Sequence, residues 1–162
     1  MTRFLAAAVA ACLAMPALAG DLTVDDAYAR TANQKVGAAF MHIKNAADAP
    51  DRLIEARSDA ARKMELHTHV FEDGIARMIE VEAIDIPAQG MTKLERGGLH
   101  VMFIGLNEDW SQGDSVPVTL VFESGAELSL DITVDNERQD APAGHGHGGH
   151  GHGHGHAHGA DG

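Results

Sequence analysis

The sequence has almost no cysteine: the only one, Cys12, lies near the N-terminus. Without a thiol in the remainder of the chain, disulfides, iron–sulfur clusters and thiolate-bound blue copper are excluded there. Basic residues are also scarce, with 12 Lys and Arg against 24 Asp and Glu, and the formal net charge is −12. An acidic chain without a basic cluster is a poor binder of nucleic acid or of anionic membrane surfaces.

Long hydrophobic runs are absent except for residues 4–15, and this run is too short to span a bilayer. Arg3 precedes the run, and an Ala-Leu-Ala cleavage site follows at residues 17–19. This combination predicts a cleaved signal peptide over residues 1–19 and export from the cytoplasm. The residues before Cys12 weakly resemble a lipoprotein cleavage box, but the apolar run ahead of it would be very short. We therefore expect cleavage at the Ala-Leu-Ala site.

Helical periodicity is lacking as well, and only residues 59–62 could form a single helical turn. Between residues 20 and 134, short runs rich in β-formers alternate with turn signals, which predicts an all-β fold built as an antiparallel sandwich or barrel. The expected strands cover residues 22–28, 36–43, 53–56, 64–71, 75–81, 99–106, 116–122 and 128–134.

The composition changes after Val134. Residues 135–143 are polar and contain prolines, which is typical of a linker, and residues 144–162 repeat glycine and histidine. Because this repeat has no apolar side chain large enough to build a core, we expect it to be disordered without metal. The predicted organisation is a signal peptide at 1–19, one domain at 20–134, and a linker with a His-rich tail at 135–162.

Inside the domain, an Asp-Gly pair at residues 73–74 predicts a tight β-hairpin. With these as the turn residues, His69 lies opposite Met78 and His67 lies opposite Glu80. Side chains alternate along a strand, so all four share one face. His67 and Met78 are then diagonal neighbours with Cα atoms about 7–8 Å apart, close enough for two long side chains to share one ion.

His100 and Met102 also share a face, because they are two residues apart in an expected strand. If that strand lay beside the hairpin, His67, Met78, His100 and Met102 would form a set of two imidazoles and two thioethers. Such a soft set favours Cu(I) over hard cations. The sequence alone does not show that the four residues meet.

Other histidines and methionines carry weaker signals, because a single methionine is usually a core filler. We interpret Met64 as a core residue, Met41 and Met91 as core or edge residues, and His42 as a surface residue. His69, on the same hairpin face as Met78, is a candidate auxiliary ligand.

The tail carries a separate group of histidines interleaved with glycine. Neutral imidazoles in such a segment bind Cu(II), Ni(II) or Zn(II) with little selectivity. We interpret the tail as an arm that collects or buffers Cu(II) for the core site; the alternatives are general metal buffering or an inert solubilising end. Its histidines are His145, His147, His150, His152, His154, His156 and His158.

The spacing of the four core residues reads H-x10-M-x21-H-x-M. This motif resembles that of the periplasmic PCuAC-type copper chaperones, and flanking stretches such as MELHTHVFEDGIARM, LERGGLHVMFIGL and GDSVPVTLVFESG resemble that family too. The resemblance covers about residues 21–134. It implies a cupredoxin-like β-sandwich, Cu(I) held by two His and two Met, and copper supply to cytochrome c oxidase assembly. The implied partners are the copper-site subunit of the oxidase and a Sco-type protein.

One departure and three alternatives accompany this resemblance. Many relatives carry a Met shortly after the first His, where this chain has Thr68 and His69. An electron-transfer cupredoxin would need a thiolate, which the exported chain lacks. A general periplasmic copper, zinc or nickel buffer remains the main alternative. Because no nucleophile elbow, paired-carboxylate motif or zinc-protease helix is present, we do not expect an enzyme.

Overall fold

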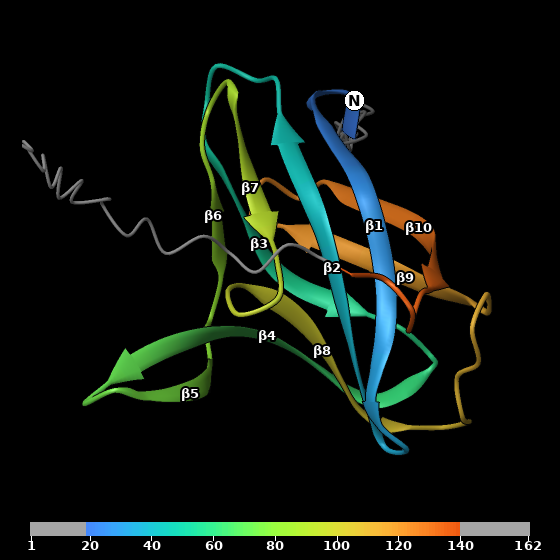
Figure 1. The fold of residues 1–162 in the computed structure, drawn as a ribbon. Coiled ribbons are helices and arrows are strands. Elements are labelled where there is room, and N and C mark those ends of the chain that lie inside the picture. Colours follow the sequence, from blue (N-terminus) through green and yellow to red (C-terminus); the bar gives the residue numbers. More distant parts are fainter. Residues whose placement is uncertain (1–18, 140–162) are drawn as a thin grey trace, which may run out of the picture.

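The computed structural model describes residues 19–139, which form ten β-strands after a short 3-10 helix at Ala19–Asp21. Figure 1 shows how the strands are arranged. The strands are β1 (Leu22–Asn33), β2 (Val36–Asn45), β3 (Asp51–Arg57), β4 (Ala61–Glu72), β5 (Ile75–Glu80), β6 (Ile84–Ile86), β7 (Gly90–Leu94), β8 (His100–Leu106), β9 (Ser115–Phe122) and β10 (Glu127–Val134).

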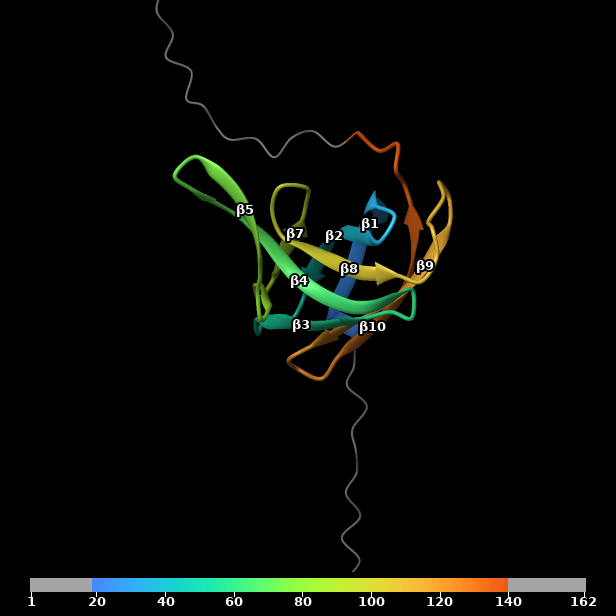
Figure 2. The same cartoon turned by 90° about the horizontal axis from the view of Figure 1, so that it is seen from below.

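The strands form one sheet that folds over into two layers (Figures 1 and 2). Their order is β5-β4-β8-β2-β1-β10-β9-β3-β6, and β7 also pairs with β2. The predicted all-β sandwich is confirmed. One pair was not predicted: β1 and β10 run parallel, with Tyr28 opposite Thr133. Two parallel strands need a long connection. The connection here is long because β1 and β10 are the first and last strands of the domain, and the other strands lie between them in the sequence.

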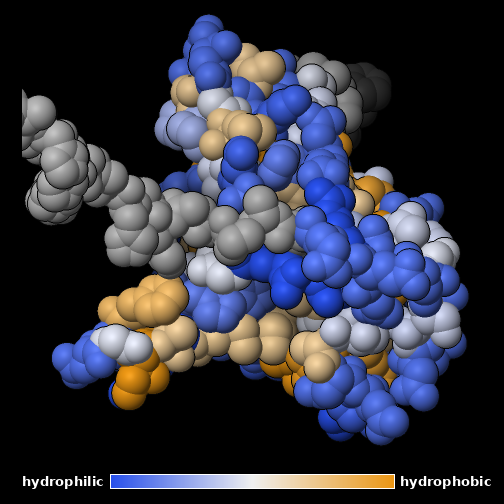
Figure 3. Space-filling view, viewed as in Figure 1, coloured by the Kyte–Doolittle hydropathy of each residue, from blue (hydrophilic) through white to orange (hydrophobic). Residues whose placement is uncertain are grey.

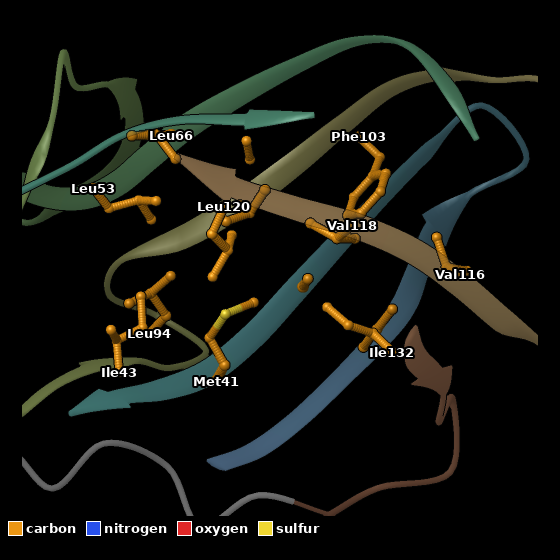
Figure 4. Close-up of a cluster of buried hydrophobic side chains, with 14 of the residues drawn as sticks. Met41, Ile43, Leu53, Leu66, Leu94, Phe103, Val116, Val118, Leu120 and Ile132 are labelled. Carbon is orange, nitrogen blue, oxygen red and sulfur yellow. The ribbon is translucent and has the colours of Figure 1, made fainter. Parts of the chain in front are cut away.

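The hydrophobic core lies between the two layers (Figure 4). Its largest fully buried side chains include Phe103 and Phe122 from β8 and β9 and Met41 from β2. The assignment of Met41 to the core is confirmed. Met64 is partly buried against this core, and Met91 is 40% exposed on the short strand β7.

All eight predicted strands are present, most of them longer than expected, but β6 and β7 were missed. Both are short and lie on either side of Pro87, so the run of alternating side chains that marks a strand in sequence is too brief to recognise. The single helical turn considered for residues 59–62 is not formed, since a turn at Asp59 and Ala60 leads directly into β4. Residues 19–139 include no helix with the length and apolar character to cross a bilayer.

The β4–β5 hairpin extends away from the sandwich (Figure 1) and has the predicted register. Asp73 and Gly74 both have positive φ angles, 52° and 77°, as the turn of a two-residue hairpin requires. All of β5 is exposed, and Figure 3 shows hydrophobic surface on this hairpin at the lower left. The exposed apolar side chains there are Phe71, Ile75, Met78 and Ile79.

We expect Gly37→Ala to lower the free energy of unfolding by about 1–3 kcal/mol, as overpacking of a core does. Gly37 in β2 lies against the Trp110 ring, and a Cβ added there would come within 2.8 Å of Trp110 Cη2. Trp110 cannot retreat freely because its ring packs edge-on against Phe103 at 4.9 Å. Urea unfolding followed by circular dichroism measures the effect. Gly98→Ala is the control, since its nearest non-neighbour atom lies 3.6 Å away, and equal midpoints for the two variants would contradict the expectation.

Candidate metal centre

The candidate site lies on the outer face of strands β4 and β8, which pair antiparallel. Leu66 and Val101 are opposite each other and point into the core, where both are buried. Because side chains alternate, the next pair along, His67 and His100, lies on the opposite face of the sheet. The pairing of β4 with β8 therefore brings the two predicted histidines together, with ring centroids 5.8 Å apart.

Met78 reaches this pair from β5. Its sulfur atom lies 3.1 Å from His100 Nε2. His67 and Met78 are diagonal neighbours, as the hairpin register predicted. Met78 is 44% exposed, whereas His100 is only 3% exposed, so the group has one buried side and one side open to solvent.

Met102 lies two residues along β8 from His100 and shares its face of the strand. It is opposite Glu65 in β4 and Ala38 in β2, and its side chain is partly buried. The strand register thus places Met102 beside the group, whereas Met78 contacts His100 directly.

The imidazole of His100 is held in one tautomer. Its Nδ1 lies 2.9 Å from the carbonyl oxygen of Gly98, which can only accept a hydrogen bond, so Nδ1 carries the proton. The other nitrogen, Nε2, then presents a lone pair toward Met78. Burial lowers the pKa of His100, which keeps the ring neutral at neutral pH and suited to bind a metal. Phe40 packs on this ring at 6.0 Å between centroids and covers it from the β2 side.

The imidazole of His67 has a different partner, the carboxylate of Glu65, which sequence analysis missed. His67 Nε2 lies 2.6 Å from Glu65 Oε2, and the same carboxylate pairs with Lys63. The hydrogen bond from Lys63 is the main cause of a lowered pKa at Glu65, with the bond to His67 adding to it, so the carboxylate stays ionised. The signal that could have found Glu65 is its spacing, since a residue two before His67 in a strand shares its face.

Three further predictions concern the other histidines of the chain. His69 lies at the edge of the group, with its ring 5.3 Å from that of His100 and its Nδ1 3.4 Å from Gly98 O. His42 lies apart from the group and is 3.6 Å from the carboxylate of Glu95, partly exposed. The tail histidines, from His145 to His158, lie outside the described residues.

The donor set decides which ions this face could hold. Within residues 19–139, no three His, Asp or Glu side chains gather closely enough to hold a metal ion. The sulfur of Met78 is a further donor atom beside the two imidazoles, 3.1 Å from His100 Nε2. Imidazole with thioether is a soft set, which selects Cu(I) rather than calcium or magnesium.

The fold and this face define a β-sandwich protein with a candidate metal centre, where His67, His100 and Met78 lie together and Met102 lies beside them in register. Residues 22–134 match the family described as "Putative lipoprotein LpqE-like", and the chain belongs to this family. A relative from Leifsonia xyli subsp. xyli (strain CTCB07), "Putative lipoprotein Lxx21020", is 31% identical over 117 residues, which cover 72% of this chain and 70% of the relative.

Solved structures similar to this chain include PCuAC domains and a Cu(I) form of DR1885. The "Copper-bound PCuAC domain from PmoF2" is 25% identical, with a TM-score of 0.61, and the match covers 72% of this chain and 94% of that domain. "CuI-DR1885 from Deinococcus Radiodurans" is 33% identical, with a TM-score of 0.57, over 75% of this chain and 84% of the other. The resemblance to the PCuAC-type family and the cupredoxin-like fold are confirmed.

Proposed function

We propose that this protein is a copper chaperone that binds Cu(I) through His67, Met78, His100 and Met102. The observation that carries this proposal is the 3.1 Å approach of Met78 sulfur to His100 Nε2. Both atoms are electron-pair donors, and a soft cation is a partner that they can share. The solved relatives described as copper-bound and as Cu(I) forms support the choice of metal.

The position of the site suits a carrier. Met78 is exposed on a hairpin that projects from the sandwich, so a partner's ligand can reach an ion held there without unfolding of the core. Thioethers carry no proton, and Cu(I) accepts low and distorted coordination, so one ligand at a time can be exchanged. The role is binding and transfer of a cargo ion rather than catalysis.

The destination of the copper is the finer part of the proposal. We infer delivery to the copper-site subunit of cytochrome c oxidase, in cooperation with a Sco-type protein, on the resemblance to PCuAC-type chaperones. The signal peptide that the sequence predicts at residues 1–19 supports a periplasmic location for this exchange. The description of the family as lipoprotein-like is also that of an exported protein.

The alternative is a general periplasmic buffer for copper, zinc or nickel, favoured by the tail composition. Seven histidines among glycines bind several borderline ions, whereas the described face with its thioethers prefers Cu(I). We propose that the tail captures or buffers Cu(II) beside a selective core site. A chaperone would hold its most tightly bound ion in the sandwich, whereas a general buffer would hold it in the tail.

Deletion of residues 144–162 should distinguish a copper chaperone from a general metal buffer. We expect the truncated chain to retain one tight Cu(I) site per molecule and to lose most Cu(II) and Zn(II) binding, because the soft thioether donors lie in the sandwich and the tail offers imidazoles without thioethers. Titration against a chromophoric Cu(I) chelator under reducing conditions, with a parallel Cu(II) titration, measures both. The full-length His100→Ala variant is the matched control and should show the opposite pattern. If truncation abolished the tight Cu(I) site, the buffer would be the better description.

A further inference from the structure

Glu65 is an unusual residue to find in the middle of this face. Its side chain is only 10% exposed, although it belongs to a strand whose neighbouring Lys63 is 61% exposed. Carboxylates are rarely buried without partners, because removing the charge from water is costly. Here the charge is held by Lys63 on one side and by the imidazole of His67 on the other.

The contact with His67 decides which ring nitrogen is free. An ionised carboxylate only accepts hydrogen bonds, so the proton in the 2.6 Å contact belongs to His67 Nε2. A neutral imidazole then has its lone pair on Nδ1. That atom is buried and has no hydrogen-bond partner among the described residues, which is a costly arrangement for a polar atom unless a ligand completes it.

We propose that Glu65 is a positioning residue of the metal site: it holds the Nε2–H of His67 and leaves Nδ1 as the atom that binds copper. This inference rests on the proposed function. A carboxylate that accepts the second ring N–H of a histidine fixes the ring orientation and raises the basicity of the binding nitrogen. Glu65 contributes through His67 and does not itself bind the ion.

His100 has the same arrangement with the nitrogens exchanged. The carbonyl of Gly98 accepts from its Nδ1, and its Nε2 faces Met78. Each imidazole therefore has one nitrogen tied to a protein oxygen and the other left for metal. The oxygen that accepts from His67 belongs to the Glu65 side chain, so a mutation can remove it. The oxygen that accepts from His100 is the backbone carbonyl of Gly98, which a mutation leaves in place.

The test uses the full-length protein and two measurements. The first is the tautomer of His67 in the metal-free protein, from ¹⁵N chemical shifts of the histidine rings. We expect the proton on Nε2 in the wild type and a mixed or reversed tautomer in Glu65→Ala. The second is Cu(I) affinity by chelator competition, where Glu65→Ala should bind about 10–100-fold more weakly, the usual cost of losing such a partner.

Two further variants separate positioning from general effects. Glu65→Gln keeps an oxygen that can accept the N–H, so it should restore the Nε2–H tautomer and most of the affinity. Glu80→Ala removes the exposed carboxylate that faces His67 from the other neighbouring strand, β5, and should change neither measurement. Urea unfolding of each variant shows whether the fold is retained.

The inference is overturned if His67 carries its proton on Nδ1 in the wild type. It is equally overturned if folded Glu65→Ala binds Cu(I) as tightly as the wild type, or more tightly, because Glu65 would then be neutral or a competitor for the imidazole. A wild-type protein without Cu(I) affinity would contradict the proposed function instead, and the metal-free tautomer would still report on the hydrogen bond.

Discussion

The double variant Met78→Ala, Met102→Ala is expected to bind Cu(I) at least about 100-fold more weakly than the wild type. The loss should exceed that from removing one residue that hydrogen-bonds to a ligand, because here two ligands themselves are removed. It keeps both imidazoles but removes both sulfur donors. The remaining His67 and His100 would offer two nitrogen ligands, which hold Cu(I) less selectively and protect it less from oxidation. Chelator competition under anaerobic, reducing conditions measures the change.

The matched control for this experiment is Met91→Ala. Met91 is 40% exposed on β7, much as Met78 is 44% exposed on β5, but it lies away from the two histidines. A loss of affinity confined to the double variant would identify the thioethers as ligands. Equal affinities in the wild type and the double variant would contradict the Cu(I) site as proposed.

The second large effect concerns stability: Phe103→Ala should lower the free energy of unfolding by about 3–5 kcal/mol. Phe103 is fully buried, pairs across the sheet with Met64, and packs against Trp110 with ring centroids 4.9 Å apart. Truncation removes the hydrophobic contribution of the ring and leaves a cavity that the two rigid layers cannot close. Chemical unfolding of the metal-free protein measures the loss.

Met102→Ala is the control, because Met102 is the neighbour of Phe103 in β8 and points to the opposite face. Its side chain is only partly buried. We expect this variant to cost less than about 1 kcal/mol of stability, as most substitutions outside a packed core do, while it weakens copper binding. If the two variants were destabilised to a similar extent, the inner face of β8 would not be the face that stabilises the fold while the outer face binds copper.

Local features of the fold were predictable from sequence because neighbouring residues determine them. The alternation of Leu128, Leu130, Ile132 and Val134 with polar residues predicted a strand, and the structure buries that face more than the other. The Asp73-Gly74 pair predicted the hairpin and its register, since few residue pairs adopt two positive φ angles. The strand β6 was missed because three residues are too few to show a period.

For the site, the sequence alone determined the candidates: His67 and Met78 share a hairpin face, and His100 and Met102 share a strand face. Only the tertiary structure decided that the strand carrying His100 and Met102 pairs with β4, which brings His100 beside His67 and Met78, and that Glu65 holds one of the imidazoles. The physical reason is that turns and alternation depend on neighbouring residues. The pairing of distant strands depends instead on which apolar faces of the whole chain can be buried together.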